Sequence, residues 1–293
     1  MSPSNGPQHG SRLPETLTLS RPGRSASYCV LGDPAGAPVL VWHGSPGSRY
    51  QMLPLHTAAA EAGLRLIALD RPGVGQSSPE AAQGFSLGAG DALAVLDALG
   101  VSSATALGFS GGAGYALAFT DAHRERIDRV VLVCGMIPGP PRSTLRERIP
   151  IVSALYRVAR VAPWLATAML DGRGPFARTR AANFDAWPEA DRAVMTNEMV
   201  QQQLAADAAE ATRQGSRAAV NDLRWYSRPF DLGMVSQPVQ LLHGTDDGNV
   251  PIAVARWAAT QLPNAALHEL PNQGHYFAAA HPGLVIDALR SDA

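Results

Sequence analysis

Two hydrophobic patterns alternate along the first half of the chain. Short apolar runs at Pro38–Trp42, Leu64–Leu69 and Ala104–Phe109 end abruptly in loops that contain glycine or proline, which is typical of buried strands. Ser86–Leu99 and Ala113–Ala122 instead repeat apolar residues at helical spacing. Because strand, loop and helix alternate, we predict an α/β fold with a mostly parallel central sheet and helices on both faces.

This alternation stops in the middle of the chain and returns near its end. Residues 138–229 are rich in arginine, alanine and aromatic residues and contain no strand-like run. We therefore predict a helical cap at 138–229, inserted into a core formed by 16–137 and 230–293, with 1–15 as a flexible N-terminal tail. The further predicted strands are Leu17–Leu19, Ala26–Leu31, Arg129–Cys134, Pro238–Leu242 and Ala266–Leu270, and the further predicted helices are Leu145–Val161, Ala190–Ala211, Arg213–Trp225, Ile252–Leu262 and Pro282–Leu289.

Composition narrows the class of protein. Hydrophobic residues make up 46% of the chain and charged residues 17%, as in a globular protein, and the net charge of −1 gives no reason to expect a nucleic-acid or membrane partner. Cys29 and Cys134 lie in strand-like runs, so we expect two buried thiols and no metal site. The polar first residues do not resemble a secretory signal, and no apolar stretch could span a bilayer, so we expect a cytoplasmic protein.

The most specific chemical motif is Gly108-Phe-Ser-Gly-Gly112, which lies between a predicted strand and a predicted helix. A tight turn there would hold Ser110 in strained backbone geometry, and side chains at the flanking glycine positions would collide with neighbouring elements. The helix that follows would favour negative charge at its N-terminus. Ser110 is therefore the candidate nucleophile.

A serine nucleophile needs a base and a group that orients the base. His275 follows the last predicted strand in Asn272-Gln-Gly-His275, and we predict that it is the base. The loop after the preceding strand offers two adjacent carboxylates, Asp246 and Asp247. The register G-x-x-D-x-x-V-P selects Asp247 as the acid, with Asp246 as the alternative.

An oxyanion hole would complete such a site. His43-Gly-Ser-Pro-Gly47 follows an early strand, and the amides of Ser45 and Gly111 could donate to a tetrahedral intermediate. The Ser45 side chain could contact substrate or serve only within its loop. The loop Asp70-Arg-Pro-Gly-Val-Gly-Gln-Ser77 follows the next predicted strand, and we interpret it as structural. We expect Arg71 to form an ion pair from this loop.

These four segments, taken in order, resemble the α/β-hydrolase fold superfamily, and the resemblance covers nearly everything from about Leu17 onward except the insertion. HGSPGSR and DRPGVGQS are similar to the branch that contains proline iminopeptidases and related esterase-like hydrolases. The resemblance implies a hydrolase without a cofactor and with a helical cap over its pocket. Ser45 stands where proline iminopeptidases usually have glycine, and no acidic motif for a substrate amine is evident in the insertion, so the sequence does not indicate a peptidase.

We therefore predict a serine hydrolase that cleaves an ester or related acyl bond of a small-molecule substrate. Its triad would be Ser110, His275 and Asp247, with an acyl-enzyme intermediate. The alternatives are the same triad acting on a carbon–carbon, lactone or amide bond, and a ligand-binding member of the fold without activity. We expect the arginines of the insertion to lie on solvated helix faces, unless one or two reach the pocket and hold an acidic substrate. We expect its aromatic residues to pack between cap and core: Tyr156, Trp164, Phe176, Phe184, Trp187, Trp225 and Tyr226.

Overall fold

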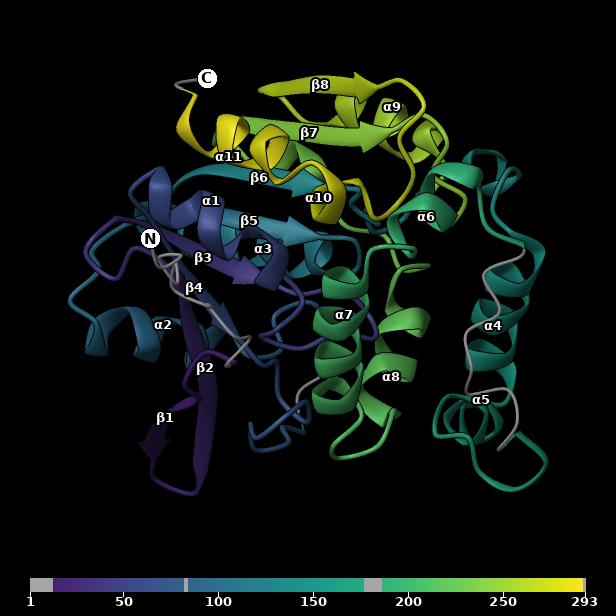
Figure 1. Ribbon diagram of the computed structural model, residues 1–293, viewed down its shortest axis with the longest axis horizontal. Helices are drawn as coiled ribbons and strands as arrows, with labels where there is room; N and C mark the ends of the chain where they lie inside the picture. The colour runs from purple at the N-terminus through teal and green to yellow at the C-terminus, as the bar shows by residue number, and fades with distance from the viewer. Residues whose placement is uncertain (1–12, 82–83, 177–185, 292–293) are drawn as a thin grey trace, which may run out of the picture.

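An eight-stranded sheet with the order β1-β2-β4-β3-β5-β6-β7-β8 forms the centre of the computed structural model, which describes residues 13–81, 84–176 and 186–291 (Figure 1). β1 and β2 pair antiparallel, as do β2 and β4, and every other neighbouring pair is parallel. The predicted mostly parallel sheet is therefore confirmed. The strands are β1 (Leu17–Arg21), β2 (Arg24–Gly32), β3 (Ala37–Trp42), β4 (Leu64–Leu69), β5 (Ala104–Phe109), β6 (Ile127–Val133), β7 (Val239–Gly244) and β8 (Ala265–Leu270).

Helices cover both faces of the sheet, as predicted. On one face, α2 (Ala89–Ala98), α3 (Gly112–Ala122) and α9 (Ile252–Gln261) pack against alternate strand residues such as Leu40 and Ile67. On the other face, α1 (His56–Glu61), α10 (Phe277–Ala280) and α11 (Pro282–Arg290) pack against the intervening residues. Because both faces are covered, every residue of β5 and β7 is buried, which explains why both strands are mostly apolar.

A second group of helices lies between β6 and β7 in the chain: α4 (Pro150–Val161), α5 (Pro163–Leu170), α6 (Glu189–Val194), α7 (Glu198–Ala211) and α8 (Arg217–Trp225). Figure 1 places them beyond the arrowheads of β5, β6 and β7, at the carboxyl ends of the parallel strands. Short 3₁₀ turns occupy Leu53–Leu55, Arg124–Arg126, Arg142–Leu145 and Leu232–Met234. Within the described part of residues 138–229 there is no strand.

Several helix boundaries predicted from the sequence are wrong. The helix predicted from Ser86 begins only at Ala89, because Gly88 has a φ of +79°. The single helix predicted at Ala190–Ala211 is two helices, and the second begins where the Asn197 side chain accepts hydrogen bonds from the amides of its first turn.

Three further differences lie within the insertion. The helix predicted from Leu145 begins at Pro150, which suits the first helical position because its missing N–H has no partner there. α5 was not expected, and α8 starts four residues later than predicted, after Gly215 with its φ of +83°. The predicted tail lies mostly outside the described residues.

Buried polar contacts join α7 to the loop that follows β3. Asp207 accepts hydrogen bonds from the backbone N–H and the hydroxyl of Ser48, each at 2.7 Å. Glu210 accepts one from the Arg49 guanidinium at 2.9 Å, and Arg49 also pairs with buried Asp70. A charged group that is removed from water needs a close hydrogen-bond or ion-pair partner, and each of these carboxylates has one. The contacts therefore fix the position of α7 on the core.

Asp207 gives this contact a pH dependence. Burial raises the pKa of Asp207 to about 7, although the Ser48 hydrogen bonds favour the ionised form. A carboxyl group whose pKa is raised by folding contributes stability that is fully present when the pH is below its pKa in the unfolded chain, about 4. That contribution is lost as the pH rises to the folded-state pKa of about 7. Asp207→Asn keeps an acceptor oxygen for Ser48 without a charge. We expect the variant to gain Tm relative to the parent between pH 4 and 7 and to keep that gain above pH 7.

Thermal melts from pH 4 to 9 measure this effect. Glu198→Gln is the matched control, because Glu198 is exposed on the same helix. A difference between Asp207→Asn and the parent that does not change with pH would contradict the prediction.

Both cysteines are buried and free, as expected. Among the described residues, no helix has the length and apolar character that crossing a membrane requires.

Candidate active site

Ser110 lies on the turn between β5 and α3, at the carboxyl edge of the sheet. Its φ is +48°, in the left-handed region that costs energy for a residue with a side chain. Backbone bonds hold the turn in place, since the Ser110 N–H donates to the Val133 carbonyl at 2.9 Å. Its carbonyl accepts from Met136 at 2.8 Å. A Cβ at Gly112 would lie 1.9 Å from the Trp42 carbonyl oxygen, so only glycine allows this close approach.

The structure brings Ser110, His275 and Asp247 into one hydrogen-bonded row. His275 Nε2 lies 3.0 Å from Ser110 Oγ, and its Nδ1 lies 2.7 Å from Asp247 Oδ2. The three residues follow β5, β8 and β7, whose carboxyl ends meet at the same edge. Asp246, the alternative acid, is exposed and instead accepts a hydrogen bond from Thr245. The geometry therefore selects Asp247 as the partner of His275.

The charges of this row favour an ionised acid beside the imidazole. Burial would raise the pKa of Asp247, but His275 and His243 outweigh it and hold that pKa well below its usual range. Burial likewise disfavours a charged His275, yet the Asp247 carboxylate raises the pKa of His275 above its ordinary value of 6.5. An imidazole oriented in this way can accept a proton from Ser110 and return it later.

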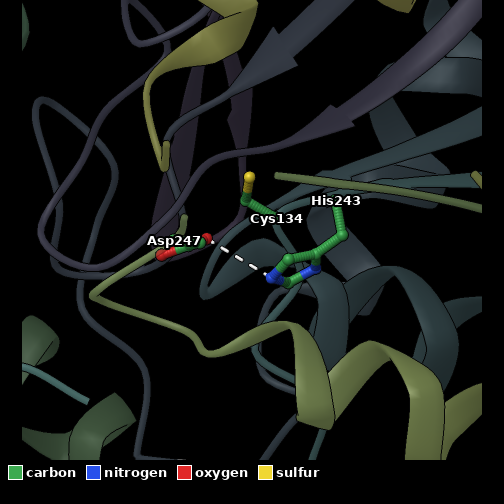
Figure 2. Close-up of side chains that lie close together, drawn as sticks. All are labelled: Cys134, His243 and Asp247. Atoms are coloured by element: carbon green, nitrogen blue, oxygen red, sulfur yellow. Dashed lines mark ion pairs between the residues drawn. The ribbon is translucent and has the colours of Figure 1, made fainter. Parts of the chain in front are cut away.

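Figure 2 shows Cys134, His243 and Asp247 close together, with the ion pair between His243 and Asp247 dashed. One nitrogen, one sulfur and one carboxylate oxygen lie within 4.8 Å of one another, which is close enough for metal ligands. These atoms already have other partners, however. His243 Nε2 donates to the Val250 carbonyl at 2.7 Å, and Asp247 Oδ1 accepts two backbone N–H groups at 2.8 Å.

The thiol in this group lies beside the Asp247 carboxylate. Burial and the nearby Asp247 charge raise the pKa of Cys134 well above its ordinary range. We therefore interpret Cys134 and His243 as support for Asp247. His243 keeps the structural role predicted from the sequence.

The predicted oxyanion amides lie beside the nucleophile. A Cβ built on Gly111 would be 3.0 Å from the Ser45 amide nitrogen, so the two backbone segments are adjacent. Neither N–H has an acceptor among the residues that the structure describes. The Gln51 side chain accepts from the Gly44 amide, and the Tyr226 hydroxyl donates to the Gly111 carbonyl. Both amides are thus positioned and free to donate to an oxyanion.

The Ser45 side chain belongs to a polar network that links its loop to α8. Its hydroxyl donates to Asp222 of α8 and accepts from Arg71 at 2.8 Å. Arg71 forms an ion pair with Asp222 and donates to the carbonyls of His43 and Gly44, which confirms the predicted loop ion pair. The network ties the oxyanion loop to the helical insertion.

Sequence reasoning missed the partners that the insertion supplies. Asp222 and Tyr226 have no motif around them and are recognised only from their contacts. Trp225 and Tyr226 are buried as predicted, but the packing role predicted for Trp164 is wrong, because its exposed fraction is 73%. Phe184 lies outside the described residues. Most described arginines of the insertion are exposed as expected, whereas Arg148 is buried.

A serine on a strained strand-to-helix turn, backed by histidine and aspartate after later strands of a parallel sheet, defines the α/β hydrolases. The comparison with known families agrees, since the α/β hydrolase fold family matches residues 37–282. The chain belongs to this family. Its relatives are named as hydrolases, and the chain is an enzyme of that class.

The similar proteins carry different substrate names. A 2-hydroxy-6-oxononadienedioate/2-hydroxy-6-oxononatrienedioate hydrolase of Paraburkholderia phymatum is 30% identical over 75% of this chain and 73% of its own. A pimeloyl-[acyl-carrier protein] methyl ester esterase of Aromatoleum aromaticum is 41% identical, but the match spans only 22% of each chain. Among solved structures, an esterase from Rhodococcus sp. ECU1013 is 25% identical, with a TM-score of 0.68 over 94% of this chain and 97% of that one.

Proposed function

We propose that this enzyme hydrolyses a carboxylic ester of a small molecule through an acyl-enzyme on Ser110. His275 takes the Ser110 proton as the oxygen attacks the ester carbonyl, and the amides of Ser45 and Gly111 stabilise the oxyanion. The intermediate collapses, the C–O bond to the alcohol breaks, and His275 gives its proton to the departing alcohol. Water then attacks the acyl-enzyme with His275 again as base, releasing the acid and restoring Ser110.

One observation carries this proposal: His275 is within hydrogen-bond distance of both Ser110 Oγ and Asp247 Oδ2. A binding protein would need neither the strained turn at Ser110 nor the buried acid. The two free amides beside Ser110 add the donors that acyl transfer needs. Together they support hydrolysis over ligand binding alone, which stays the alternative from another functional class.

We further propose that residues 138–229 form a cap over this site. The support is the position of the described helices of this segment at the carboxyl ends of the strands, where open α/β sheets bind ligands, and the Arg71–Asp222 pair that joins α8 to the core. A lid of this kind would exclude water and enclose an apolar substrate. The cytoplasmic location and the likeness to proline iminopeptidases stay predictions from the sequence.

A second candidate reaction uses the same triad on a carbon–carbon, lactone or amide bond. The observation that favours it is the similarity to a hydrolase whose named substrate is a 2-hydroxy-6-oxo dicarboxylate and not an ester. Ester hydrolysis ranks first because a solved structure of similar extent and the short local match are both named esterases. Either reaction would use the same Ser110 and His275.

The direct test combines active-site labelling with a substrate panel. We expect the purified protein to react with a fluorophosphonate probe, to give a burst with p-nitrophenyl acetate, and to hydrolyse short-chain esters, with rates that EDTA leaves unchanged. Turnover of lactones or carbon–carbon substrates in preference to every ester would favour the second reaction. Absence of both labelling and turnover would favour the ligand-binding alternative.

A further inference from the structure

Arg148 is a buried arginine near the start of the helical insertion, and the loop that carries Asp247 fixes its position. Only 5% of the residue is exposed. The next residue, Ile149, donates its backbone N–H to the Gly248 carbonyl at 2.8 Å, directly after Asp247. Arg148 therefore reaches its buried position from backbone held beside the triad acid.

The guanidinium of Arg148 has no carboxylate partner among the residues that the structure describes. Its Nη2 lies 3.0 Å from the Met136 sulfur, which is a weak acceptor, and its Nε is buried without any partner. By contrast, the buried Arg49 and Arg71 both pair with carboxylates. A buried cation without an oxygen acceptor is costly, so a group supplied from outside the chain would stabilise it.

An aromatic ring supports this cation. The Arg148 Cζ lies 4.3 Å from the centroid of the Tyr156 ring, in a cation–π contact that orients the plane of the guanidinium. The Tyr156 ring in turn lies 6.5 Å from that of Tyr226, whose hydroxyl contacts the Gly111 carbonyl. The pair is thus linked by packing to the predicted oxyanion hole.

Arg148 also lies close to the nucleophile and the base. Met136, which contacts the guanidinium, donates its backbone N–H to the Ser110 carbonyl at 2.8 Å. The positive charge of Arg148 lowers the pKa of His275, against the larger opposite effect of Asp247. Both observations place the Arg148 guanidinium close to Ser110 and His275.

We propose that Arg148 binds a carboxylate of the substrate, so that the enzyme prefers anionic esters such as half-esters of dicarboxylic acids. The planar guanidinium can hold a carboxylate through two parallel hydrogen bonds, with Tyr156 keeping it in orientation. This inference rests on the proposed ester hydrolysis and adds the chemical class of its substrate. Arg148 would determine specificity and take no part in proton transfer.

Matched substrates test the preference. We would compare monomethyl dicarboxylates, from succinate to adipate, with methyl alkanoates of the same length, using pH-stat titration. The parent enzyme should show a kcat/KM at least tenfold higher for one or more of the anionic esters. Arg148→Met should lose roughly 10- to 100-fold on those anionic esters and stay within about threefold on the neutral ones.

Two further variants sharpen the comparison. Arg148→Lys keeps the charge but loses the fork, and we expect a smaller loss on the anionic esters. Arg146→Met, two residues earlier and exposed, should leave both classes of ester unchanged. A parent enzyme without preference for any anionic ester overturns the proposal, even if Arg148→Met fails to fold. Equal losses of Arg148→Met on both classes also overturn it.

A binding measurement separates this inference from the proposed reaction. Isothermal titration of monomethyl adipate into Ser110→Ala should show binding. The Kd measured in the same way for Ser110→Ala/Arg148→Met should be at least tenfold higher. If the parent hydrolyses no ester but this difference is present, the proposed reaction fails and the carboxylate site stands. If esters are hydrolysed but Ser110→Ala binds the half-ester no better than the double variant, the carboxylate site fails alone.

Discussion

Ser110→Ala is expected to abolish fluorophosphonate labelling and to lower kcat on esters by roughly four orders of magnitude or more. The physical reason is that alanine leaves the two oxyanion amides and His275 in place but removes the atom that forms the acyl-enzyme. The fold should survive, because the neighbours of Ser110 are held mainly by backbone bonds. Steady-state kinetics and gel-based labelling measure both effects.

The matched control for this variant is Ser102→Ala, an exposed serine before β5. It should label and turn over like the parent. Mass spectrometry of the labelled parent should place the phosphonate on the peptide that contains Ser110. Labelling of Ser110→Ala at the parent's rate, or a phosphonate on another serine, would show that Ser110 is not the nucleophile.

The sequence predicted the core strands well because their signal is local. β4 and β5 have the same bounds in the sequence and in the structure, since short apolar runs that end in loops with glycine or proline leave little choice of length. The residues that lie in one row, Ser110, Asp247 and His275, each follow such a strand. Parallel strands bring their carboxyl ends to one edge, so the contact between these residues could be predicted without coordinates.

The insertion could not be predicted to the same depth, because its contacts are set by tertiary packing. Arg146 and Arg148 have similar surroundings in the sequence, yet one is exposed and the other is buried. The partner of Arg71 is Asp222, 151 positions away, on a helix whose register no core motif fixes. The break between α6 and α7 depends on capping by Asn197, which a periodic pattern does not reveal.

Asp247→Asn is expected to lower kcat by roughly four orders of magnitude, whereas Asp246→Asn should stay within about threefold of the parent. Asp247 is buried and bonded to His275 Nδ1, and an asparagine there would favour the wrong tautomer of the imidazole. Asp246 is exposed and, within the described part of the chain, bonded only to Thr245 and the backbone, so it supplies a control of identical chemistry one residue away. Similar losses in the two variants, or a larger loss at Asp246, would contradict the assignment of the acid.

The pH dependence tests the same assignment independently of the rate at its plateau. Only neutral His275 can take the Ser110 proton, so kcat/KM on a non-ionisable ester should fall as the pH drops through the pKa of His275. Because the Asp247 carboxylate raises that pKa, the acidic limb of the parent's pH–rate profile should lie above pH 6.5. Asp247→Asn removes the negative charge, and burial then dominates, so its limb should move to lower pH while that of Asp246→Asn stays in place. A limb that stays at the same pH in Asp247→Asn would mean that the titrating group is not the imidazole paired with Asp247.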